Sequence, residues 1–315
     1  MLFKTLASAV FYGRFARAFS ALGYRQAARG FSATPFDLTG QRWLVTGASG
    51  GIGKAIALEA NRLGAQVVAV ARSKNKLDAL VSEASAPERL GIEVCDLSSL
   101  EAISDWVGRF QSSASEPVDV LVNNVGVLLN RYTQTEEGIE QSLATNLLGP
   151  VLLTRRLLSE GGLSTDSTVI NVSSGGMYAT PLELDSMIAP DPQHFDGVRA
   201  YALHKRAQVV WTHHWNSVHL KGPVMQVMHP GWVDTEGVKT SLPGFRKVMK
   251  PILRTPIEGA DTVLWLGAQR PAPPKEGIWL DRAVQPEHAF SMTKKTRVSV
   301  EDLVAYLDEA LAKFL

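Results

Sequence analysis

A tyrosine and a lysine stand four residues apart in the stretch Tyr201-Ala-Leu-His-Lys205. On a helix this spacing places both side chains on one face. An ammonium group near a phenol favours the phenolate, and so lowers the tyrosine pKa from its usual value of about 10. The pair could therefore exchange a proton near neutral pH, as general acid–base chemistry requires. The alternative interpretation is an exposed lysine beside a partly buried tyrosine.

Three further groups of residues precede this pair along the chain. They are a glycine-rich turn from Thr46 to Gly53 (TGASGGIG), the element Asn123-Asn-Val-Gly126, and the serine pair Ser173-Ser174. The turn lies between an expected strand and an expected helix, where free backbone N–H groups can bind a pyrophosphate. Glycine also occurs in ordinary tight turns, so the position of this turn carries the argument. Together the groups predict a nicotinamide-dependent oxidoreductase.

The residues after the second expected strand bear on the choice of cofactor. An acid here binds the ribose 2′-hydroxyl of NAD, whereas a basic group accommodates the additional phosphate of NADP. The stretch Ala71-Arg72-Ser73-Lys74 has no carboxylate, and Arg72 can donate two hydrogen bonds to a phosphate. We therefore expect NADP(H), with NAD(H) as the alternative; a surface arginine is the simplest interpretation. Asp96, followed by Leu97, is placed to meet the adenine, although Asp-Leu-Ser is also typical of a helix cap.

Composition and charge narrow the class of protein. The chain has 315 residues, of which 45% are hydrophobic and 20% charged, which excludes a disordered or fibrous chain. The net charge of +1 gives no strong field for nucleic acid. The single cysteine, Cys95, cannot form an internal disulfide, so a reducing cytosol is permitted. His213 and His214 are adjacent and would point about 100° apart on a helix, so no metal site is predicted.

Short apolar runs alternate with amphipathic segments from residue 40 onward, which is typical of βαβ units. The expected fold class is α/β, a Rossmann-like doubly wound parallel sheet of about seven strands with helices on both faces. The expected strands are 42–45, 66–71, 92–94, 118–122, 168–172, 224–228 and 277–280. The expected helices are 52–63, 74–85, 100–110, two between 122 and 168, 200–219, 257–267 and 299–315, with loops at 175–199 and 236–256.

Residues 1–36 form a basic amphipathic leader with three interpretations. Phe11, Phe15, Phe19 and Leu22 recur at helical spacing, and the arginines lie mostly off that line. This pattern fits a helix docked on the protein body, which we favour slightly, or a helix lying in a membrane interface through residues 2–22. An organelle transit peptide has the same composition. Charges interrupt every apolar run, so no membrane span is predicted, and a cytoplasmic location is expected.

With these residues the chain resembles the short-chain dehydrogenase/reductase (SDR) family, of the single-domain type, from about Leu38 to Ala289. The matching motifs are the turn at 46–53, Asn123–Gly126, Asn146 in Ala-Thr-Asn-Leu-Leu-Gly, Ser174, Tyr201 with Lys205, and Pro-Gly-x-x-x-Thr at 230–235. The aromatic and basic leader and the segments 172–177, 195–197, 201–210, 228–235 and 259–266 also resemble, over nearly the whole chain, the group called dehydrogenase/reductase SDR family member 12. The chain departs from the family at Val125, where alanine is usual. The Ser174–Tyr201 gap is also twice the common one, which implies an inserted loop over the substrate site.

The resemblance implies roles for these residues. Tyr201 would act as general acid or base, Lys205 would lower its pKa, Ser174 would orient the substrate oxygen, and Asn146 would support a proton relay. Residues 37–290 would form the catalytic domain and 291–315 a helix packed on it. The expected cofactor contacts are Thr46, Gly47, Ser49, Gly51, Ile52, Gly53, Arg72, Asp96, Leu97, Asn123, Asn124, Gly126, Tyr201, Lys205, Pro230, Gly231, Val233 and Thr235.

The expected function is hydride transfer between NADP(H) and a carbonyl or alcohol. The apolar segments around Trp232 and 237–248 favour a lipophilic small molecule as substrate. One alternative is a non-catalytic NAD(P)-binding sensor or scaffold, and another is a membrane-peripheral enzyme of lipid metabolism. In many relatives the helices corresponding to 146–158 and 200–219 form a homodimer face, which the leader or the tail helix could cover here.

Overall fold

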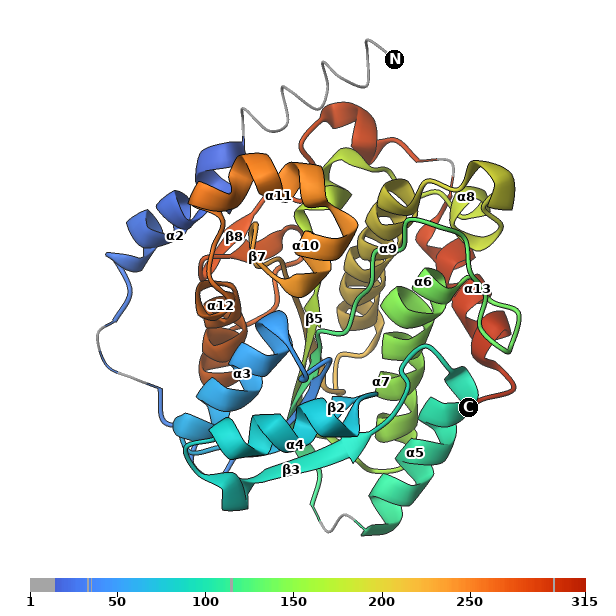
Figure 1. Cartoon of the computed structure of the whole chain (residues 1–315). Coiled ribbons are helices and arrows are strands. Elements are labelled where there is room, and N and C mark those ends of the chain that lie inside the picture. The colour runs from blue at the N-terminus through green and yellow to red at the C-terminus, as the bar shows by residue number, and fades with distance from the viewer. Residues whose placement is uncertain (1–14, 33, 35, 114–115, 297) are drawn as a thin grey trace.

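The central element of the chain is a twisted sheet in the order β3-β2-β1-β4-β5-β6-β7-β8 (Figure 1). The computed structural model describes residues 15–32, 34, 36–113, 116–296 and 298–315. All neighbouring strands pair in parallel except β7 and β8. The strands are β1 (Arg42–Thr46), β2 (Gln66–Ala71), β3 (Leu90–Val94), β4 (Val118–Asn123), β5 (Leu163–Val172), β6 (Val224–Met228), β7 (Ile278–Leu280) and β8 (Ala283–Gln285). The predicted α/β class is confirmed.

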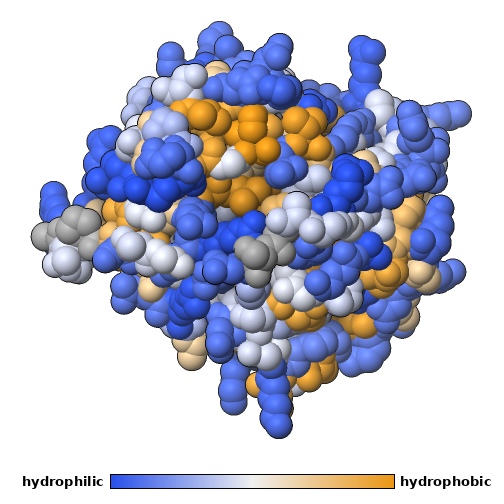
Figure 2. Space-filling model, turned by 90° about the horizontal axis from the view of Figure 1, so that it is seen from below, coloured by the Kyte–Doolittle hydropathy of each residue, from blue (hydrophilic) through white to orange (hydrophobic). Residues whose placement is uncertain are grey.

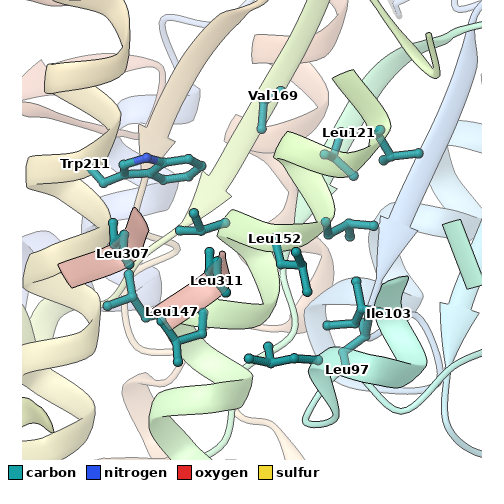
Figure 3. Packing of buried hydrophobic residues seen from close by; sticks show 14 of the residues in the cluster. Leu97, Ile103, Leu121, Leu147, Leu152, Val169, Trp211, Leu307 and Leu311 are labelled. Atoms are coloured by element: carbon teal, nitrogen blue, oxygen red, sulfur yellow. The ribbon is translucent and has the colours of Figure 1, made fainter. Parts of the chain in front are cut away.

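The middle strands are apolar without alternation because helices cover both of their faces. Trp43, Leu44 and Val45 in β1 are fully buried. One face is covered by α3 (Gly51–Arg62), α4 (Lys74–Glu83) and α12 (Pro256–Gln269). The other is covered by α5 (Leu100–Ser113), α7 (Gly149–Ser159) and α9 (Gly197–Val218). On this second side Ile103, Leu152 and Trp211 pack against Leu121 and Val169 of the sheet (Figure 3).

The tail forms α13 (Val300–Leu311), as predicted for 299–315. Ser299 and Asp302 make a reciprocal capping box at its start, which satisfies two backbone donors at the helix end. Leu303, Leu307 and Leu311 are buried in the same cluster as Trp211 of α9, and Leu307 and Leu311 lie beside it in Figure 3. The tail therefore covers part of the helical face that the family resemblance suggested for a homodimer.

The described part of the leader is docked on the body. Residues 15–19 are helical, and α2 (Ala21–Ala28) follows after Ser20. Phe19 and Ala21 are buried, which agrees with the docked-helix interpretation for this part. Phe11 and Arg14, on which the interfacial interpretation also drew, lie outside the described residues. Among the described helices we find none with the length and apolar character that crossing a bilayer requires.

The loops expected at 175–199 and 236–256 contain short helices. The second holds α10 (Glu236–Ser241), α11 (Pro243–Met249) and η5 (Lys250–Ile252). Thr235 caps α10 by accepting a hydrogen bond from the Val238 N–H, and Pro243 stands in the first turn of α11, where proline is tolerated. The first holds η3 (Gly175–Ala179), α8 (Asp185–Ile188) and η4 (Pro192–His194). The glycine and proline residues in these stretches predicted loops, but several of them stand at the beginnings of short helices.

The largest differences from the predicted strands are at β5 and β8, whereas the other strand ends agree within two residues. β5 begins at Leu163, five residues earlier than expected, and β8 was not predicted. Asp281 and Arg282 join β7 to β8 and both have positive φ angles of 51° and 60°, which a two-residue hairpin requires. The hairpin therefore forms without the glycine or asparagine that would have indicated it. The remaining elements are η1 (Pro87–Arg89), α6 (Gln141–Leu143), η2 (Ala144–Leu148) and η6 (Ser291–Lys294).

The surface is mixed in character. On the face seen in Figure 2 most side chains are hydrophilic, and apolar ones gather in separate areas between them. A folded chain cannot cover its whole surface with polar atoms, so such areas are ordinary. A functional site is instead expected at the carboxyl ends of the parallel strands, where open α/β sheets bind ligands.

Candidate active site

The strand order reverses between β1 and β4, and a crevice opens at the carboxyl ends of the strands there. It has a volume of about 440 Å³. Ligands of doubly wound folds bind at such switch points. Its lining residues are Gly47, Ser49, Gly50, Gly51, Ile52, Arg72, Asn124, Val125, Gly126, Val172, Ser173, Ser174, Tyr201, Lys205, Pro230, Gly231, Val233, Thr235, Glu236, Gly237 and Val238. Most of the predicted site residues are therefore brought together.

The glycine-rich turn meets the first helix with its backbone exposed to the crevice. Gly47 and Gly51 have φ angles of +67° and +54°, which other residues rarely adopt. At Gly53 a Cβ atom would lie only 2.4 Å from both the Asn124 Nδ2 atom and the Gly47 carbonyl oxygen. A larger residue would therefore push the turn away from β4, and the N-terminus of α3 would lose the open approach that a pyrophosphate needs.

Thr46 does not line the crevice, but its hydrogen bonds hold the glycine-rich turn in place. Its hydroxyl donates to the Val122 carbonyl at 3.0 Å and accepts from the backbone N–H groups of Asn124 and Val125 at 3.0 and 3.2 Å. The Asn124 amide in turn donates to the Thr46 carbonyl at 2.8 Å. These bonds join the ends of β1 and β4, the two strands between which the crevice opens.

The structure does not bring Asn123 to the crevice, although it was predicted as a cofactor contact. Its side chain is fully buried and its amide donates to Thr154 and Asn171, at 3.1 and 3.0 Å. Residues alternate in direction along a strand, so Asn123 points into the body while the chain turns at Asn124 toward the crevice. Asn123 thus connects β4 to β5 and α7.

The residues predicted to bind the adenine end of the cofactor lie in two neighbouring hollows or in the core. Arg72 is exposed and lines both the crevice and a neighbouring hollow, which also holds Asp96 and Arg109. Asp96 accepts from the Ser98 N–H and hydroxyl, at 3.0 and 2.7 Å, in the turn before α5, whereas Ser99 caps that helix by accepting from the Ala102 N–H at 3.1 Å. Leu97 is buried in the core. Cys95 is also buried.

Tyr201 and Lys205 lie on consecutive turns of α9. The helix begins earlier than expected because Asp196 caps it by accepting from the Arg199 N–H at 3.0 Å. The Lys205 Nζ atom lies 5.8 Å from the centre of the Tyr201 ring. Lys205 is 1% exposed, and burial lowers its pKa to about 7. A desolvated ammonium therefore lies near the phenol ring, in the arrangement that the sequence predicted.

The lysine amine has two fixed hydrogen-bond acceptors. It donates to the Val172 carbonyl at 2.8 Å and to the Gln208 Oε1 atom at 3.1 Å. Val172 ends β5, and the Ser173 hydroxyl after it donates to the backbone carbonyl of Lys205 at 3.0 Å. The end of β5 and the middle of α9 are therefore joined around this amine.

The Tyr201 hydroxyl faces Ser174. Burial raises the pKa of Tyr201 above its usual value, and hydrogen bonding with Ser174 opposes that rise. Ser174 is half-buried and also accepts from the Gly176 N–H at 3.4 Å, as the cap of η3. The two hydroxyls predicted to share a substrate oxygen thus meet at the crevice. That Lys205 lowers the tyrosine pKa stays a prediction.

Asn146 lies behind this group, in the π-helical turn η2 between α6 and α7. Its amide makes two hydrogen bonds with the Val127 backbone, both of 2.8 Å. A Cβ atom at Gly126 would lie 3.4 Å from both the Asn146 Oδ1 atom and the Lys205 Nζ atom. Single π turns inside helices occur frequently at functional sites, and this one brings Asn146 against the segment that faces the lysine.

Sequence reasoning missed two of the lysine's neighbours. Gln208 follows Lys205 by three residues on the same helix, so its contact could have been found from spacing alone. Ser173 was noted only as part of the serine pair. The Val172 acceptor is a backbone carbonyl, and no residue type indicates it. Among the described residues no cluster of His, Cys, Asp and Glu suited to a metal ion occurs.

Comparison with known proteins gives one consistent family. The model described as short chain dehydrogenase matches residues 41–182. Dehydrogenase/reductase SDR family member 12 of Bos taurus is 35% identical over 98% of this chain and 98% of its own length. Retinol dehydrogenase 12 of Bos taurus is 31% identical, over 86% of this chain and 84% of its own. Tyr201 and Lys205 lie beyond the residues that the family model matches, but within the span of the first relative.

Two solved structures share the fold. An uncharacterised protein from Mycobacterium paratuberculosis has a TM-score of 0.67 and 24% identity, over 90% of this chain and 98% of that one. A structure described as an NAD(P)-dependent gluconate 5-dehydrogenase from Beutenbergia cavernae, with bound NADP at low occupancy, has a TM-score of 0.56. It is 25% identical and covers 75% of this chain and 92% of its own.

The buried lysine predicts a pH-dependent stability. Its pKa is about 7 in the folded chain, whereas the usual value is near 10.4. Between these values the unfolded chain binds a proton that the folded chain lacks, so folding stability rises with pH. In wild type this contributes roughly 2–3 kcal/mol between pH 6 and pH 9. Lys205→Met lacks this contribution. We therefore expect the difference in unfolding free energy, variant minus wild type, to become more negative by this amount from pH 6 to pH 9.

Chemical denaturation at several pH values measures this difference. Lys221→Met, at an exposed lysine, is the matched control and should parallel wild type. A Lys205→Met variant that also runs parallel to wild type would mean that the lysine is not desolvated.

Proposed function

This chain belongs to the short-chain dehydrogenase/reductase family, and from that premise we propose that it transfers hydride between NADP(H) and a carbonyl or alcohol. Members of the family are NAD(P)-dependent oxidoreductases. The observation that carries the proposal is the meeting of Ser174, Tyr201 and Lys205 in the crevice that also holds the glycine turn. A protein that only bound the dinucleotide would need the turn, but not a proton donor with an ordered partner.

The residues fit a dinucleotide along the whole crevice. The N-terminus of α3, with Gly47, Ser49 and Gly51, would hold the pyrophosphate by backbone N–H groups. The nicotinamide carboxamide would lie against Gly231, Val233 and Thr235, which line the crevice after β6. NADP(H), when bound, supplies or accepts the hydride. The chain's own residues supply orientation and the proton.

The proton chemistry follows from the three side chains. In reduction the Tyr201 hydroxyl donates its proton to the substrate oxygen, and in oxidation the phenolate accepts it. Ser174 donates a hydrogen bond to the same oxygen and so fixes the reacting carbon. The Lys205 ammonium favours the phenolate because the surroundings are desolvated and the charge is weakly screened. Asn146, held at Val127 beside Gly126, would support resupply of the proton behind the lysine.

A lipophilic substrate is supported by apolar residues at the crevice and in the segments after β6. Val238 lines it from α10. Trp232 packs edge-on against Phe245 of α11, with ring centres 5.5 Å apart. Apolar and aromatic side chains of this kind typically line small-molecule pockets. The names of the relatives agree, since one acts on retinol by its name.

Removal of the phenol hydroxyl tests the catalytic assignment. We expect Tyr201→Phe to lower kcat by about 10²–10⁴, the usual contribution of a general acid, while the Kd for NADPH stays nearly unchanged. The measurement is NADPH absorbance with panels of aldehydes, ketones and lipid alcohols, beside a fluorescence titration of the cofactor. Tyr306→Phe on α13 is the matched control. Turnover by Tyr201→Phe at the wild-type rate would reject the assignment.

Arg72 provides the test of the NADP preference. Its guanidinium is exposed at the crevice and would donate charge-assisted hydrogen bonds to the 2′-phosphate. Arg72→Ala should raise the Kd for NADPH by about 10- to 100-fold, corresponding to roughly 1.5–3 kcal/mol of binding free energy. The Kd for NADH should stay within about twofold of the wild-type value. Lys76→Ala, at an exposed position on α4, should change neither. Wild type that prefers NADH would show that the assignment of Arg72 is wrong.

A membrane surface is the second partner that specific observations favour. Leu22 is 57% exposed and Val248 75%, and Leu22, Arg25, Arg29 and Ile252 line one hollow between α2 and η5. Exposed apolar side chains among cations are typical of interfacial contact with anionic lipid. This surface adjoins the helices that flank the crevice (Figure 1), so a lipophilic substrate could enter from the bilayer.

Charge introduced at this surface tests the membrane contact. The double variant Leu22→Glu with Val248→Glu should pellet less than wild type with vesicles of phosphatidylcholine and phosphatidylserine. Leu220→Glu is the control, because this residue is 84% exposed and precedes the amino end of β6, whereas the crevice lies at the carboxyl ends of the strands. Equal pelleting of all three proteins would argue against a lipid partner at this surface.

A further inference from the structure

The leader packs behind the wall of the active-site crevice at Phe19. This residue is 2% exposed. Its ring stacks on Phe15 with centres 4.8 Å apart, and meets the rings of His229 and Trp232 edge-on at 4.5 and 5.7 Å. A Cβ atom on Gly175, the residue after Ser174, would lie 3.1 Å from the Phe19 ring. One aromatic ring of the leader thus touches both segments that flank the predicted nicotinamide end.

A buried arginine holds this part of the leader in place. Arg254 is 1% exposed. Its guanidinium donates to the carbonyl oxygens of Ala18, Phe19 and Ser20, at 2.7, 3.1 and 3.2 Å. It also makes two hydrogen bonds with Asp281, of 2.5 and 2.9 Å. A cation at the carbonyl end of a helical turn is favourable, and a buried charge needs this complete set of partners.

Backbone hydrogen bonds continue this contact into the crevice. The Trp232 N–H donates to the Phe19 carbonyl, and the Arg254 N–H donates to the Trp232 carbonyl, both at 2.7 Å. The Asp234 N–H donates to the Arg254 carbonyl at 2.9 Å. The chain after β6 is therefore held between the leader on one side and the segment of Arg254 on the other.

Gly231 marks how close this packing is. Its φ angle is +73°, and a Cβ atom there would lie 2.6 Å from the Phe19 carbonyl oxygen and 2.4 Å from the Arg254 Nε atom. Gly231 itself lines the crevice together with Pro230 and Val233. The leader thus lies directly behind the backbone that faces the ligand, with no room for a side chain between them.

We propose that Phe19 and Arg254 are positioning residues for the nicotinamide end of the site. Docking of residues 15–20 fixes the Pro230–Thr235 segment and the Ser174–Gly175 corner relative to each other. This inference rests on the proposed function. It makes the leader a constituent of the active enzyme, so its removal as a transit peptide would disable the protein. The adenine end, at Arg72, does not contact residues 15–20 and should not respond to them.

A split between two ligands tests the proposal in the full-length chain. NADPH occupies both ends of the crevice, whereas 2′-phospho-ADP-ribose lacks the nicotinamide and reports the other end alone. Phe19→Ala should raise the Kd for NADPH by about tenfold, the equivalent of about 1.4 kcal/mol. It should lower kcat by about 10- to 100-fold through misplacement of the ring. Binding of 2′-phospho-ADP-ribose should stay within twofold of wild type.

Two variants control for stability. Phe19→Leu keeps most of the buried volume. It should weaken NADPH binding by a smaller factor and again leave the binding of 2′-phospho-ADP-ribose unchanged, so it replaces Phe19→Ala if that variant does not fold. Phe31→Ala removes a leader ring that contacts Tyr24 and Arg282 instead of the crevice, and should leave both ligands and kcat unchanged. Melting temperatures are measured for all variants.

The outcomes separate this inference from the proposed function. Equal weakening of both ligands, in step with a lower melting temperature, would mean that the leader only stabilises the fold and would overturn the proposal. Unchanged NADPH binding and kcat in a folded Phe19→Ala variant would also overturn it. Wild type that binds neither ligand would instead reject the proposed function, and this inference with it.

Discussion

The desolvated ammonium of Lys205 is the interaction on which the rest of the site depends. A lysine that is 1% exposed is costly to bury, and hydrogen-bond acceptors for its amine offset part of that cost. Here the acceptors come from the last carbonyl of β5 and from Gln208 on α9. Strand end, helix and phenol are therefore held in one arrangement, and Gly126 leaves the space beside the amine that Asn146 also approaches.

A second buried cation organises the opposite wall of the crevice. Arg254 binds three leader carbonyls and Asp281, which begins the turn between β7 and β8. The leader, the end of the sheet and the segment after β6 thus converge on one guanidinium. The two cations lie in different parts of the site: Lys205 lies near the phenol ring of Tyr201, while Arg254 holds the leader against the segment after β6. The planar fork of arginine suits this role, since it satisfies several oxygens at once.

The short helices between 236 and 256 show a limit of predicting secondary structure from sequence patterns. Glycine and proline between 236 and 256 indicated a loop, yet Thr235 and Pro243 begin helices there. Whether such residues end or start a helix depends on the next turn of the chain and on what it packs against. The same limit applies to the stretch 175–199, where α8 is docked through buried Met187. Asn123 lies away from the crevice for a related reason, since its neighbour turns toward the crevice while its own side chain stays in the core.

The sequence by itself determined the first seven strands and the long helices between them, the glycine turn, the pair on α9 and the tail helix. All of these are local, because spacing and residue type decide them within a few turns of chain. Only the tertiary structure decided which groups meet across long separations. It placed Phe19 against Trp232, Arg254 against three leader carbonyls, and the tail helix over α9. These contacts join residues more than 80 positions apart, and many run through backbone atoms, which every residue type carries alike and no sequence pattern can reveal.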